Sequence, residues 1–172
     1  MKRLSVLAAV CAVIMSLTVP LLAKDIGYYL ELGDRVTVGQ YTLKEGVLRV
    51  DKKGTQIDGM QVIIPPGTFP REETFTVSYV KVKKAHVRDY AISPLISISC
   101  DTRPAGMVVV KIPCRVPDNT AAMAFLYDET EKFTEGLPLG PKEAGYVTAM
   151  TRVLENIVVV ATKASSVGGK QK

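Results

Sequence analysis

One short basic stretch contains the side chains of this sequence that are best suited to catalysis or charged binding. Residues 81–88 contain the only histidine, His86, together with three lysines and an arginine. A catalytic histidine needs a nucleophile to activate and a carboxylate to orient it, and only Asp89 lies close by in sequence. Because nothing completes such a set, the sequence favours a solvent-facing histidine over a general base.

The same stretch indicates a positively charged surface. Lys81 and Lys83 alternate with Val80 and Val82, so both lysines are expected on one face of a strand. Such a surface suits an anionic partner, for example an acidic protein, a polysaccharide or lipid headgroups. The sequence favours the other interpretation, in which these lysines guard an edge strand against pairing with other chains, because that role is common. The candidate basic patch consists of Lys81, Lys83, Lys84, His86 and Arg88.

Cys100 and Cys114 are the cysteines outside the N-terminal segment. In an oxidising compartment they could form a disulfide, which would add about 3 kcal/mol in the chain-entropy description. The alternative is a pair of small, buried, unreactive thiols. Two thiols and one distant histidine do not make a zinc site, so we expect no metal and no cofactor.

Acidic side chains gather after residue 127, but their pattern is not that of a calcium loop. A calcium loop needs several spaced oxygen ligands and a glycine turn, which this segment lacks. A solvated loop is therefore favoured, and no phosphate loop or nucleophile elbow occurs elsewhere. We expect a protein that is not an enzyme. The acidic residues are Asp128, Glu129, Glu131 and Glu135.

The N-terminus has the pattern of a secretory signal peptide. A basic start is followed by an apolar run and a small-residue exit, which predicts a signal over residues 1–23 with cleavage between Ala23 and Lys24. An uncleaved anchor is the alternative. We expect export to the periplasm or the extracellular space and no membrane span after signal removal. The net charge of +5 for the whole chain is too small to indicate nucleic-acid binding.

The rest of the chain predicts a single β-sandwich domain over residues 24–163, followed by a disordered tail over 164–172. Short alternating segments are separated by glycine, proline, asparagine and aspartate, and no window has a helical period. Residues 128–133 are expected to form at most one helical turn. Expected strands are 28–32, 35–43, 47–50, 60–64, 74–82, 92–100, 107–112, 123–127, 146–150 and 153–161.

The segment around a double proline resembles a known family. Residues 46–50 and 59–64, followed by Pro65-Pro66-Gly67-Thr68, are similar to the opening of the ZU-five domain of zonula occludens proteins, netrin receptors and ankyrins. Residues 92–98 and 108–113 look like its later strands, so the resemblance covers residues 44–161. It implies an antiparallel β-sandwich of the ZU-five type that serves protein–protein contacts.

Some ZU-five relatives cut themselves at a histidine-phenylalanine-serine triplet before the last strand. The comparable place in this chain reads Leu154-Glu155-Asn156, with neither a hydroxyl nor a histidine. Self-cleavage needs a hydroxyl with a base beside it, so it is not expected.

The leading hypothesis is a non-catalytic, exported β-sandwich that binds an envelope or extracellular macromolecule, either a protein or an anionic polymer. A second hypothesis is a structural protein that assembles through paired strand edges. A third is a hydrolase whose residues converge only in three dimensions.

Overall fold

The structure is a computed structural model that describes residues 29–86, 90–128, 132–141 and 143–163. Within these ranges the regular elements are eleven strands in two antiparallel sheets, which confirms the predicted all-β fold. The predicted signal peptide 1–23, its cleavage site at Ala23 and Lys24, Arg88 of the basic patch and the tail 164–172 lie outside the described residues.

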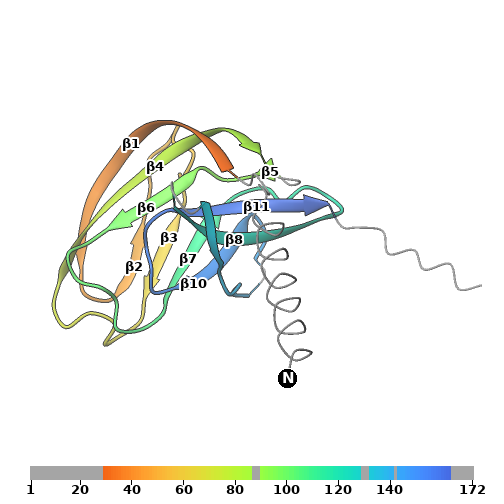
Figure 1. The fold of residues 1–172 in the computed structure, drawn as a ribbon. Helices are drawn as coiled ribbons and strands as arrows, with labels where there is room; N and C mark the ends of the chain where they lie inside the picture. Colours follow the sequence, from red (N-terminus) through yellow and green to blue (C-terminus); the bar gives the residue numbers. More distant parts are fainter. Residues whose placement is uncertain (1–28, 87–89, 129–131, 142, 164–172) are drawn as a thin grey trace, which may run out of the picture.

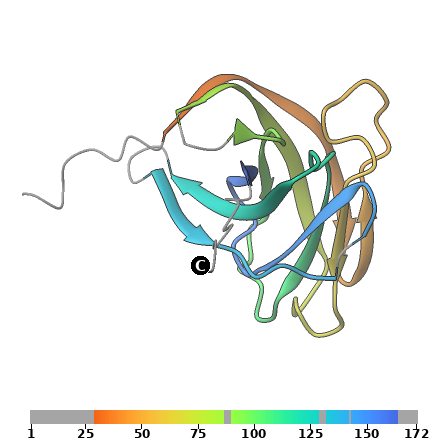
Figure 2. The ribbon, with the colours of Figure 1, turned by 90° about the vertical axis from the view of Figure 1, so that its right-hand side faces the viewer.

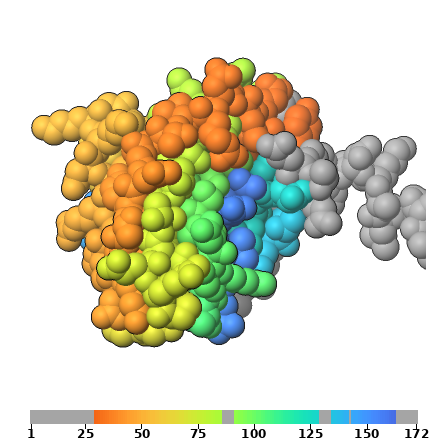
Figure 3. Space-filling view, turned by 90° about the vertical axis from the view of Figure 1, so that its left-hand side faces the viewer, coloured from red at the N-terminus to blue at the C-terminus, as the bar shows by residue number. Residues whose placement is uncertain are grey.

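The larger sheet has seven strands in the order β1-β4-β6-β11-β8-β9, with β5 paired to β11. Figure 3 looks onto its outer face, where the colours run from orange β1 through yellow-green β4 and green β6 to blue β11 and cyan β8. The strands are β1 (Tyr29–Leu43), β4 (Glu73–His86), β5 (Tyr90–Ala91), β6 (Leu95–Ser99), β8 (Thr120–Asp128), β9 (Lys132–Gly136) and β11 (Ile157–Lys163).

The smaller sheet has the order β10-β7-β3-β2 and lies behind the larger one in Figure 1. Its strands are β2 (Gly46–Arg49), β3 (Gln61–Ile64), β7 (Val108–Pro113) and β10 (Tyr146–Thr151). The segment before β10 extends this sheet, because Leu139 bridges to Ala149 and the Gly140 N–H donates to the Thr148 carbonyl at 2.8 Å. The two sheets curve round a common interior (Figure 2).

The main core fills the space between the two sheets. Phe75 and Val77 of β4 are fully buried there, whereas Thr74 and Thr76 on the opposite face of the strand are not. This alternation follows from the two-residue period of a strand. The smaller sheet supplies Val62, Ile64, Val108, Val110 and Ile112 to the same core.

A second apolar cluster lies on the other face of the larger sheet. Val80, Leu95 and Val158 belong to it, and each directly follows or precedes a residue of the main core along its strand. Leu30 of β1 packs here, and its N–H donates to the Tyr127 hydroxyl at 3.0 Å. Between Tyr79 and Val80, β4 therefore passes from the main core to the second apolar cluster.

The double proline ends β3 at Ile64, as predicted, because proline cannot donate to a sheet. The chain then turns through Gly67, whose φ of +78° suits glycine, and the Thr68 N–H donates to the Pro65 carbonyl at 3.2 Å. The turn directs Phe69 into the main core, where its ring meets the Phe75 ring edge-on with centroids 5.3 Å apart.

Several strand boundaries differ from the sequence prediction. The two strands expected before residue 44 form one strand, β1, because shifts in its pairing with β4 absorb Gly33 and Asp34. The helical turn predicted over 128–133 is wrong where it is described, since Asp128 ends β8 and Phe133 belongs to β9. The strand expected from residue 92 begins only at Leu95, directly after Pro94, and the one expected from residue 153 begins at Ile157.

Candidate functional site

The three lysines of the basic patch lie toward the C-terminal end of β4. Lys81, Lys83 and Lys84 are all exposed. The neighbouring strand β6 pairs with β4 only from Thr76 to Val80, so the lysines extend beyond the part of β4 that is enclosed by two strands. β4 ends opposite Tyr29 at His86, whose side chain is outside the description.

The long side chains of Lys81 and Lys83 share one side of the β1–β4 ribbon. Lys81 Cβ and Lys83 Cε lie 3.5 and 3.3 Å from the position that a Cβ on Gly33 would occupy. Both lysine side chains therefore lie beside Gly33, and the absence of a side chain at Gly33 leaves room for them. Lys84 pairs across the ribbon with Glu31, whose carboxylate offsets part of the positive charge.

The edge-guarding interpretation of these lysines fits this end of the sheet. β1 is the outer strand, but β6 pairs with β4 only from Thr76 to Val80, so beyond Val80 the side of β4 that faces away from β1 is itself an edge. Lysines that guard an edge are expected on the edge strand itself. At the edge, Lys52 covers one backbone group, because its Nζ donates to the Val38 carbonyl of β1 at 2.8 Å.

The possible disulfide is not present, because Cys100 and Cys114 are both free thiols. Cys100 follows β6 in the larger sheet and donates to the Thr102 carbonyl, whereas Cys114 follows β7 in the smaller sheet and donates to the Ile112 carbonyl. The chain enters β7 at the end near Cys100 and leaves it at Cys114. Six residues of strand cover about 20 Å, far more than the 7 Å limit of a disulfide.

Neither thiol is suited to nucleophilic chemistry. Burial raises the pKa of Cys114 above its usual value. Burial also raises the pKa of Cys100, and the nearby carboxylates of Glu73, Asp101 and Glu155 raise it further. The thiolate is the reactive form, so both groups are held in the unreactive state at neutral pH.

Glu73, at the start of β4, is a buried carboxylate with two polar partners. The Thr102 hydroxyl donates to Glu73 Oε1 at 2.6 Å, and Arg71 Nε lies 3.4 Å from the same oxygen. The Thr102 hydrogen bond is the main cause that lowers the pKa of Glu73 below its ordinary 4.5, and Arg71 adds to it. These contacts tie β4 to the connection between β6 and β7.

We expect Glu73 to contribute a pH-dependent part of the stability. Because its pKa is lowered by folding, the contribution is present above pH 4.5 and is lost as the pH falls through the folded-state value. In Glu73→Gln, the free energy of unfolding, measured with urea, should therefore fall less steeply as the pH drops below 4.5. Thr102→Val should show a smaller reduction of the same slope. An unchanged acid profile in both variants would contradict this assignment.

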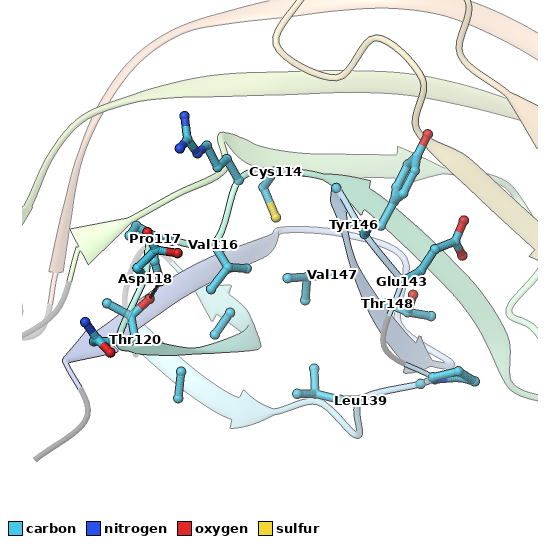
Figure 4. Close-up of a pocket in the computed structure, with 18 residues that line it drawn as sticks. Cys114, Val116, Pro117, Asp118, Thr120, Leu139, Glu143, Tyr146, Val147 and Thr148 are labelled. Carbon is cyan, nitrogen blue, oxygen red and sulfur yellow. Dashed lines mark hydrogen bonds between the residues drawn. The ribbon is translucent and has the colours of Figure 1, made fainter. Parts of the chain in front are cut away.

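A pocket of about 870 Å³ opens at the end of the main core, and it was not foreseen from the sequence. One wall is formed by residues 114–122, which lead from β7 into β8, and the other by residues 139–141 and 143–148. Figure 4 shows Cys114, Val116, Val147 and Leu139 turned toward a shared space, while the Tyr146 ring points away. Tyr146 instead donates its hydroxyl to the Gly59 carbonyl at 3.3 Å.

Thr148 borders this pocket and is buried, and its hydroxyl has no hydrogen-bond partner in the described part of the chain. It faces the opposite side of β10 from Val147, as neighbouring strand residues do. On that side Lys111 Nζ and Glu143 Oε2 form an ion pair at 2.5 Å.

The acidic residues after residue 127 are divided between two strands and a gap in the description. Asp128 ends β8 and Glu135 lies in β9, whereas Glu129 and Glu131 are outside the described residues. In the described ranges, no three histidine, cysteine or carboxylate side chains gather as a metal site would require.

Across residues 29–163, where described, the structure contains no helix long and apolar enough to cross a bilayer. No protein-family model matches this sequence, and no match was found among curated proteins.

Proposed function

We propose that this protein is a non-catalytic binding module that contacts an anionic macromolecule through the basic end of β4. The observation that carries the proposal is the position of Lys81, Lys83 and Lys84. All three are exposed at the end of β4 that pairs with β1 but not with β6. Three cations on one rigid ribbon attract and orient an anionic partner.

The proposal includes the compartment and the family. The signal-like segment over residues 1–23 supports export to the periplasm or the extracellular space. The proline corner and the two antiparallel sheets support a sandwich of the ZU-five type. The raised pKa values of Cys100 and Cys114 support a role without nucleophilic catalysis.

The test is retention of envelope components by the immobilised protein at low and moderate salt. We expect Lys81→Glu, Lys83→Glu and Lys84→Glu, combined in one variant, to lower retention of the partner at least about tenfold, because attraction becomes repulsion. Mass spectrometry and carbohydrate analysis would identify what the unaltered protein retains.

A matched control carries the same change of charge at the other end of the sandwich. Lys44, Arg103 and Arg152 are exposed there, beside the turns at the start of β4 and the end of β10. Replacing these three residues by glutamate should leave retention within about twofold of the unaltered protein. Equal losses in both triple variants would show that only net charge matters, and the proposed contact surface would be wrong.

Self-assembly is the second candidate, and it is favoured by one observation. The edge strand β1 is 15 residues long, and residues 34–37 in its middle are exposed. A long edge strand can pair with another copy. Sedimentation velocity at rising concentration would distinguish the two roles, since the binding module stays monomeric and an assembling protein does not.

A further inference from the structure

The pocket at the end of the sandwich has the properties of a small-molecule site. Its volume of about 870 Å³ lies within the range of ligand pockets, which is about 300–1,000 Å³. Val147 in its wall is part of the main core, and Cys114, Val116 and Ala122 pack against that core. The inner surface is therefore a continuation of the apolar interior.

The side chains that line the pocket favour a flexible hydrocarbon chain over a flat ring. The side chains that face the shared space in Figure 4 are aliphatic or a thiol, and the Tyr146 ring points elsewhere. Leu139, which is 49% exposed, extends the apolar surface to the mouth. No aromatic side chain among the described lining residues is turned inward for stacking, which an aromatic ligand or a sugar ring would use.

The charges around the pocket offset one another. Arg115 and Asp118 lie in the same wall with opposite signs, and the Glu143 carboxylate is paired with Lys111. Among the described residues these charges cancel once Lys111, which lies outside the lining, is counted, so neither an anionic nor a cationic headgroup is favoured. Asn119 offers a neutral hydrogen-bonding side chain, and the Thr120 hydroxyl, which donates to the Pro117 carbonyl at 2.6 Å, can still accept a hydrogen bond.

We propose that this pocket binds the aliphatic chain of a neutral amphiphile whose headgroup carries hydroxyls. The site is separate from the basic patch, because it is built from the connection between β7 and β8 and from the start of β10. Apolar burial supplies the affinity, and the polar groups of the wall meet the headgroup.

Cys114 provides a direct readout, because it lines the pocket while Cys100 lies elsewhere and serves as an internal control. The experiment measures alkylation of both thiols by iodoacetamide in the full chain at alkaline pH, where part of each thiol is ionised, and resolves them by peptide mass spectrometry. Decyl maltoside below its micelle concentration should slow modification of Cys114 about tenfold when about nine-tenths of the sites are filled, and should leave Cys100 unchanged.

Two comparisons make the test decisive. Decanoate and decyltrimethylammonium should protect Cys114 less than decyl maltoside does, and stronger protection by either would overturn the neutral headgroup.

Ala122→Trp fills the pocket and should abolish binding of decyl maltoside measured by calorimetry, whereas Ala105→Trp, at an exposed alanine outside the pocket, should not. No protection of Cys114, or equal protection of both thiols, would overturn the site itself, and neither result depends on a variant that must fold.

Discussion

Phe69→Ala is expected to lower the free energy of unfolding by about 3–5 kcal/mol, which is the usual cost of removing a buried ring. Phe69 is 1% exposed and comes directly after the turn that the double proline begins. Its ring meets Phe75 of β4 edge-on at 75°, so it joins the connection after β3 to the larger sheet. The loss combines the lost burial, a cavity and an aromatic contact of about 0.5–1.5 kcal/mol.

Urea unfolding would measure the effect as a lower midpoint with an unchanged slope. Phe69→Leu is the matched control, because it keeps much of the apolar volume and loses the ring contact, so its cost should be clearly smaller. A loss below about 1 kcal/mol for Phe69→Ala would mean that the proline corner does not direct this ring into the core.

Gly140→Ala is expected to cost about 1–3 kcal/mol, as overpacking of a well-filled site does. A Cβ at residue 140 would lie 2.6 Å from Thr148 Cγ2 and 3.2 Å from Thr148 Cβ. Thr148 is buried and β-branched, so its side chain has little freedom to move away. The hydrogen bond from the Gly140 N–H to the Thr148 carbonyl holds the two segments together and prevents an easy separation.

A double-mutant cycle with Thr148→Ala isolates the clash. Thr148→Ala removes both Cγ2 and the hydroxyl that lacks a partner, so by itself it should cost less than a typical buried threonine substitution. Gly140→Ala should then be much less harmful in the Thr148→Ala background. Purely additive losses would show that glycine is needed at this position for another reason.

The local features of the fold could be read from the sequence because they depend on single residues. Proline has no N–H, so Pro65 and Pro66 had to end β3, and the two-residue alternation of β4 placed Phe75 and Val77 on the core side. The exposure of Lys81 and Lys83 followed from the same alternation.

Features that depend on pairing between distant strands could not be read in this way. Whether Cys100 and Cys114 meet depends on where the chain crosses between the sheets, which spacing along the sequence does not encode. The pocket joins residues 114–122 with residues 139–141 and 143–148 because β7 pairs with β10, and no local motif marks that pairing. The single strand β1 likewise depends on β4, which tolerates the two extra residues Gly33 and Asp34 as an irregularity in the register.

The most direct test of the binding role is photo-crosslinking in cells that produce the protein. A benzophenone amino acid would replace Lys83 in one form and Arg103, at the opposite end of the sandwich, in another. The proposed contact predicts a partner adduct from position 83 and none from position 103. An adduct from position 103 without one from position 83 would contradict a partner that contacts the basic end of β4, and the absence of any adduct would contradict binding at this surface.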